Sequence, residues 1–72
     1  MRLDKEYLPT KEQGREIYRV LKDEKDYITE SKILEYTGIH PITILYTLNQ
    51  LDIEGLLETK EVEKNRFKFK AK

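Results

Sequence analysis

The segment from Thr29 to Leu57 constrains the fold of this chain more than any other part of it. It reads TESKILEYTGIHPITILYTLNQLDIEGLL, which predicts two helices, at about 30–36 and 41–53, separated by a tight turn. Gly38 supplies the left-handed backbone that ends the first helix, and Pro41 suits the first turn of the second. The two helices are expected to share one core, formed by Ile33, Leu34, Ile39, Ile44, Leu48, Leu51 and Leu56.

A third helix is predicted before this pair. Thr10-Lys11-Glu12-Gln13 has the form of a capping box, in which the Thr10 and Gln13 side chains each bond the other's backbone. The helix that follows runs to about Glu24, with Ile17, Val20 and Leu21 on one stripe. Tyr27-Ile28 is predicted to be a short extended piece.

The C-terminal residues predict a β-hairpin. Residues 57–62 and 66–71 both alternate as strands do, and residues 63–65 form the tip. In the second strand Phe67, Phe69 and Ala71 share one face, which leaves the basic residues on the other. The chain thus divides into an N-terminal arm at 1–9 and a single domain at 10–72, of the mainly helical α+β class.

Charge is distributed unevenly along the chain, although the fourteen basic and fourteen acidic residues cancel. Residues 1–63 contain nine basic against fourteen acidic residues, a net charge of −5, whereas residues 64–72 contain five basic residues and no acid, a net charge of +5. No Lys or Arg occurs from Ile33 to Thr59. Net neutrality argues against non-specific coating of DNA, whereas a basic segment is typical of a binding surface.

The sequence lacks the features of disulfide-bonded, membrane-spanning and secreted proteins, and those of common enzymes. It has no Cys, no apolar run near the roughly 20 residues of a membrane span, and no apolar centre of a secretory signal. It also lacks a glycine-rich phosphate loop and a nucleophile with a suitably spaced base. We therefore predict a cytoplasmic protein that is not an enzyme, does not contact a membrane, and holds no cofactor or metal.

The order of elements resembles the winged helix-turn-helix family. The residues that carry the resemblance are Ile33-Leu34, Tyr36-Thr37-Gly38-Ile39, Thr43-Ile44, Leu48-Asn49-Gln50-Leu51 and Gly55-Leu56-Leu57. The pattern is similar to that of small bacterial and archaeal transcription regulators related to the MarR and ArsR groups, over roughly positions 12–71. The resemblance implies a three-helix fold with a C-terminal two-stranded hairpin as the wing. It also implies sequence-specific binding of double-stranded DNA, as a regulator of transcription.

This resemblance assigns roles to two groups of residues. The helix at about 41–53 would enter the major groove, where Ile42, Thr43, Tyr46 and Asn49 would contact bases, and His40 at its start would meet a phosphate. The basic wing at 57–71 would contact the backbone or the minor groove through Lys64, Asn65, Arg66, Lys68 and Lys70. A homodimer is expected, as in many such regulators.

A second interpretation remains open because the predicted recognition helix carries no positive charge. Ile42, Leu45 and Tyr46 would form an apolar face that binds a protein, either a second copy of this chain or a different partner. In that case the basic strand would contact an acidic surface, or would only be a solvated edge that prevents aggregation.

Overall fold

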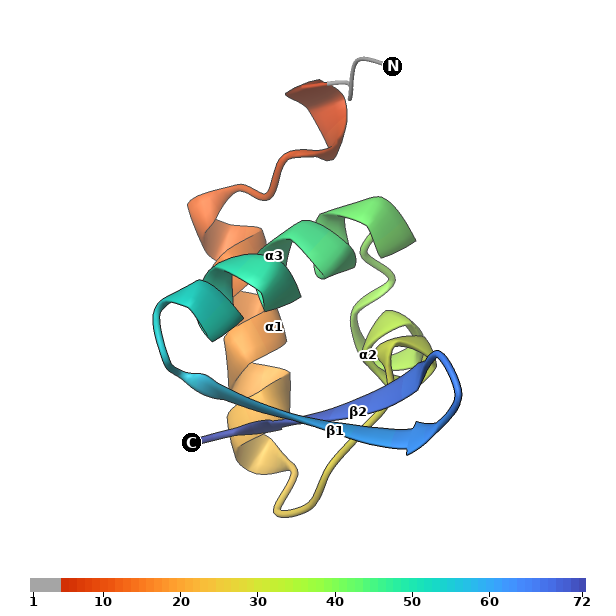
Figure 1. Ribbon diagram of the computed structural model, residues 1–72. Coiled ribbons are helices and arrows are strands. Elements are labelled where there is room, and N and C mark those ends of the chain that lie inside the picture. The colour runs from red at the N-terminus through yellow and green to blue at the C-terminus, as the bar shows by residue number, and fades with distance from the viewer. Residues whose placement is uncertain (1–4) are drawn as a thin grey trace.

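The computed structural model describes residues 5–72 and confirms the predicted fold class. Three α-helices precede one antiparallel two-stranded hairpin, in a mainly helical α+β arrangement (Figure 1). The helices are α1 (Lys11–Asp23), α2 (Glu30–Thr37) and α3 (Pro41–Ile53), and the strands are β1 (Leu57–Glu63) and β2 (Arg66–Ala71). A short 3-10 helix, η1 (Lys5–Tyr7), lies in the N-terminal arm.

The ends of the helices are fixed by the residues that the sequence indicated. The Thr10 hydroxyl accepts from the Gln13 N–H, and the Gln13 side chain accepts from the Thr10 N–H, so the capping box is complete. Thr29 caps α2 through a single bond, in which its hydroxyl accepts from the Lys32 N–H. Gly38 ends α2 with φ 68°, a left-handed conformation that costs glycine little. These caps depend on local contacts, which is why the sequence predicts them well.

The hairpin forms the two-stranded sheet and is joined by one additional bridge to the connection between α1 and α2. Its register pairs Leu57 with Ala71 and Thr59 with Phe69, and shifts between Glu61 and Glu63. Ile28, in the connection between α1 and α2, exchanges two backbone hydrogen bonds with Phe69, of 2.8 and 2.7 Å. The predicted extended piece therefore acts as a minimal third strand beside β2.

The core lies between the three helices and the inner face of the hairpin. Its largest fully buried side chains are those of Ile17, Leu21, Ile33 and Ile44, and Phe69 closes it from the hairpin side. Two residues predicted to be in the core were assigned wrongly: Leu34 and Leu56 are each 38% exposed. Each lies within a few residues of a buried neighbour, and periodicity alone does not separate a core position from the rim of a small core.

The arm is attached to α3. The Thr43 hydroxyl donates to the Tyr7 carbonyl oxygen over 2.7 Å, and the Tyr7 and His40 rings lie 4.2 Å apart between centroids. Leu8, next to these contacts, stays 49% exposed. In the described part of the arm, Tyr7 thus contacts two residues at the start of α3, and residues 1–4 lie outside the described range.

Candidate nucleic-acid interface

Helix α3 presents one continuous side to the surface. Ile42 and Tyr46 are partly buried there, whereas Leu45 and Asn49 are exposed, and Ile53 continues the same side at 78% exposure. The spacing of these residues follows the helical repeat. The opposite side is buried in the core, through Thr43, Ile44, Thr47, Leu48 and Leu51. The exposed side is therefore mainly apolar, with Tyr46 and Asn49 as polar groups and the exposed Asp52 as an acid near its C-terminal end.

The structure contradicts the prediction that Thr43 contacts a base. It is 2% exposed, and its hydroxyl is bonded to the arm, so its side chain faces away from the open side of α3. Its carbonyl oxygen also accepts from the Thr47 hydroxyl over 3.0 Å. The hydroxyl and the carbonyl oxygen of Thr43 are therefore both hydrogen-bonded inside the fold. The contact to Tyr7 spans 36 residues of sequence. Local pattern cannot reveal such a contact.

His40 lies at the start of α3, as predicted, where it is the N-cap and its ring has a structural role. Its Nδ1 accepts from the Ile42 N–H over 3.1 Å, so the neutral ring carries its proton on Nε2. The Tyr7 ring packs against it. The residue is exposed, so Nε2 remains able to meet an anion at the start of α3.

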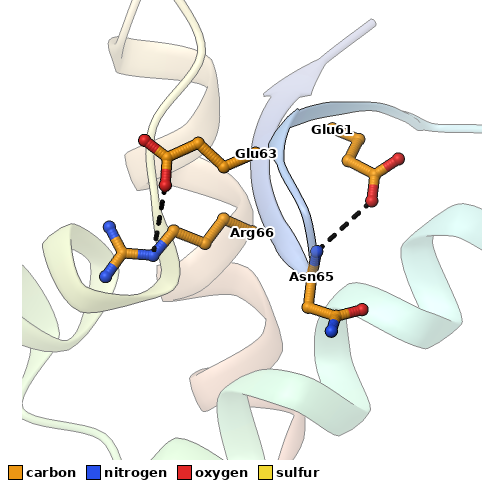
Figure 2. A network of polar contacts seen from close by, with 4 residues as sticks. All are labelled: Glu61, Glu63, Asn65 and Arg66. Atoms are coloured by element: carbon orange, nitrogen blue, oxygen red, sulfur yellow. Dashed lines mark hydrogen bonds and ion pairs between the residues drawn. The ribbon is translucent and has the colours of Figure 1, made fainter.

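The tip of the hairpin combines positive and negative groups. Asn65 turns the chain with φ 64°, and its N–H donates to Glu61 Oε2 over 3.3 Å. Arg66 Nε lies 3.9 Å from Glu63 Oε2, and both side chains are well exposed (Figure 2). An exposed pair of this kind contributes little to stability, so Arg66 and the exposed Lys64 remain available to a partner.

Lys68 and Lys70 do not lie at the tip. Strand alternation places them on the outer face of the hairpin, opposite to the face formed by Leu57, Thr59 and Phe69. The register brings Lys60 of β1 directly across from Lys68. The Nζ atoms of Lys60 and Lys70 lie 5.6 and 5.7 Å from the centroid of the Tyr27 ring. The sequence does not predict Lys60 or Tyr27 as site residues, because both join this cluster only when distant segments of the chain pair.

The inner face of the hairpin and α3 enclose a small hollow of about 210 Å³. Its apolar lining comes from Leu45, Leu48, Leu57, Phe67 and Phe69, and its charged lining residues are Glu30 and Asp52. Phe67 is 44% exposed there, although it lies on the same side of β2 as the buried Phe69. The charged groups that line this hollow are thus acids, which oppose a polyanion.

A larger hollow, of about 720 Å³, separates the start of α2 from the tip of the hairpin. Arg66 and Lys68 line it together with Glu30 and Glu63. Because the charges are mixed, this hollow favours no ligand of one sign.

The predicted residues therefore fall into three places. Ile42, Tyr46 and Asn49 share the open side of α3, with His40 at its start. Lys64, Asn65 and Arg66 lie at the tip, on the same side of the view in Figure 1 as α2 and the start of α3. The third group, Lys68 and Lys70, occupies the outer face of the hairpin.

Comparisons with protein-family models, curated proteins and solved structures give no significant match to this chain. The resemblance to the winged helix-turn-helix regulators therefore stays a prediction beyond the fold itself. Among residues 5–72, no helix combines the length and apolar character that crossing a bilayer requires.

Proposed function

We propose that the protein binds double-stranded DNA through the open side of α3 and the tip of the hairpin, and regulates transcription. The observation that carries the proposal is that α3 lies at the surface with Ile42, Tyr46 and Asn49 on one side. A helix with an open side fits the major groove, which admits one helix.

The contacts available on this side set the expected mode of recognition. The Asn49 amide can form two hydrogen bonds with adenine, and the Ile42 side chain can contact a thymine methyl group. Arg or Lys contacts to guanine are not available from α3, since the helix contains neither residue. We therefore expect a preference for A·T pairs, with Lys64 and Arg66 on phosphates.

Selection from a library of random duplexes tests this proposal directly. The wild-type protein is expected to enrich A·T-rich sites, and Asn49→Ala should lower affinity for the enriched site by about 1–3 kcal/mol. Gln50→Ala is the matched control, because Gln50 is exposed on α3 but its amide bonds Glu54 over 3.2 Å. Absence of enrichment by the wild-type protein would contradict the proposal.

The second candidate function is protein binding through Ile42, Leu45 and Tyr46. It is favoured by the hollow beside Leu45, whose lining is apolar and acidic. Leu45 is 50% exposed, which is a large apolar surface in the middle of a helix. A second copy of this chain is one such partner, and it would give the expected dimer.

Light scattering coupled to size-exclusion chromatography separates the two functions when it is combined with the DNA measurement. If α3 forms a dimer face, Leu45→Glu should abolish self-association. Lys11→Glu, on α1, is the control for an altered charge. A wild-type protein that is monomeric at all concentrations would remove self-association from this candidate.

A further inference from the structure

We propose that the outer face of the hairpin, formed by Tyr27, Lys60, Lys68 and Lys70, is a separate binding surface for the phosphate backbone of a nucleic acid. The proposal is independent of the role of α3, and either one can fail alone. If both hold, one molecule contacts two segments of nucleic acid.

The first observation is an unfavourable arrangement of charge. Lys60 and Lys68 are directly opposite on antiparallel strands, and Lys70 follows two residues later, about 7 Å along the strand. Like charges directly across a ladder destabilise a sheet. Among residues 5–72 the ion pair found joins Arg66 and Glu63, so none of the three lysines has an acidic partner within 4.0 Å. A bound polyanion would relieve this repulsion.

The second observation is that the Tyr27 ring lies beside two of these three ammonium groups. The ring lies 5.6 Å from Lys60 Nζ and 5.7 Å from Lys70 Nζ, within the range of cation–π attraction. The backbone of the next residue, Ile28, is bonded twice to Phe69, which holds the Tyr27 backbone close to β2. Since an aromatic ring leaves ammonium N–H donors free, both lysines can still bond phosphate oxygens.

The chemistry of this face favours a nucleic-acid backbone over a protein. Away from the strand ends and the register shift, its outward side chains are Glu58, Lys60, Lys68 and Lys70, all charged. Protein interfaces have an apolar core depleted in charge, and Tyr27 alone would supply it here. Binding to a phosphate backbone needs little more than convergent cations, because it is driven by the release of counterions.

The position of this face separates it from α3. The other face of the same strands carries Leu57, Thr59 and Phe69, which line the hollow against α3. A nucleic acid bound to the lysines would therefore lie on the far side of the hairpin from that hollow. The acids that could oppose it are Glu58, which lies across from Lys70 in the register, Asp26, whose carboxylate accepts from the Tyr27 N–H, and Glu30 and Glu63, which line the hollow beside Lys68.

Two measurements with a random-sequence duplex of 20 base pairs (about two turns) test the inference. In fluorescence anisotropy, the triple variant K60Q/K68Q/K70Q should reduce the slope of log K against log salt by about 2.7, or about 0.9 for each lost phosphate contact. The control K11Q/R19Q/K22Q removes the same charge from exposed positions of α1 and should leave the slope unchanged. K60R/K68R/K70R should keep the wild-type slope, which separates charge from folding.

Amide chemical shifts in the ¹⁵N-labelled protein locate the duplex. Changes near residues 27, 60, 68 and 70 support the inference, even when α3 shows none, a pattern that would contradict the proposed function alone. Changes confined to α3 and the tip would overturn the inference and leave the proposed function standing. Tighter binding of polyglutamate than of a duplex of equal charge would also overturn it, in favour of an acidic protein.

Discussion

The two faces of the hairpin are built from the same two strands, but packing in the core determines the residues of one face and charge repulsion acts on the other. The inner face places Leu57 and Phe69 in the core, where shape and burial decide which residue fits. The outer face carries three lysines, of which Lys60 and Lys70 lie beside the Tyr27 ring, and their mutual repulsion opposes stability. On the role proposed for the outer face, one strand pair serves folding with one face and binding with the other.

The largest test of this division is Phe69→Ala. The side chain is 8% exposed and belongs to the core cluster, so its truncation should lower the free energy of unfolding by about 3–5 kcal/mol. Urea unfolding followed by circular dichroism measures this change. Phe67→Ala is the matched control, since Phe67 lies two residues away on the same face but is 44% exposed, and it should cost less than half as much. Equal losses would show that the inner face is not divided into core and rim.

The turn at the tip should have the second largest effect, because it fixes the register that assigns each side chain to its face. Asn65 has a positive φ, which alanine tolerates poorly, so Asn65→Ala should destabilise the protein by about 1 kcal/mol. Asn65→Gly should be nearly neutral by comparison. The same unfolding measurement decides between them, and equal effects of the two substitutions would argue against a strained turn.

The smallest expected change in the free energy of unfolding comes from a substitution on the outer face, where stability and binding should change in opposite directions. Lys68→Glu replaces a like-charge pair with Lys60 by an opposite-charge pair, and should stabilise the protein by about 0.2–1 kcal/mol. The same variant should bind a duplex more weakly than the wild type, as measured by anisotropy. A loss of both stability and affinity would show that Lys68 contributes to the fold rather than opposing it.

The sequence predicts the elements of this fold well because their signals are local. The capping box at Thr10, the left-handed Gly38 and Pro41 at the start of α3 each act within a few residues of where they stand. Alternation in β2 also predicts correctly that Phe69 and Lys68 lie on opposite faces.

The candidate site is predicted less completely, because its residues come together from distant positions. The sequence predicts that Thr43 contacts DNA, because the helical repeat alone does not show whether its side chain faces the core or the solvent. The hydrogen bond to Tyr7, 36 residues away, shows that it is buried. Lys60 precedes the basic segment and lies among acids in sequence, so its charge is apparent only when β1 pairs with β2. Tyr27 joins the same cluster from the connection before α2. Leu34 and Leu56 show the opposite error, since the sequence predicts that these apolar residues are buried but they lie at the rim of the core.

The bridge between Ile28 and Phe69 has a consequence for how the molecule comes apart. It ties the connection between the first two helices to the last strand, 41 positions later in the chain. A protease cut at the hairpin turn that released β2 would leave the amide and the carbonyl of Ile28 without these partners and would open the core beneath them. The hairpin therefore cannot open without disturbing the connection between α1 and α2. In hydrogen exchange, the amides of Ile28 and Phe69 should become labelled together, in the same opening event.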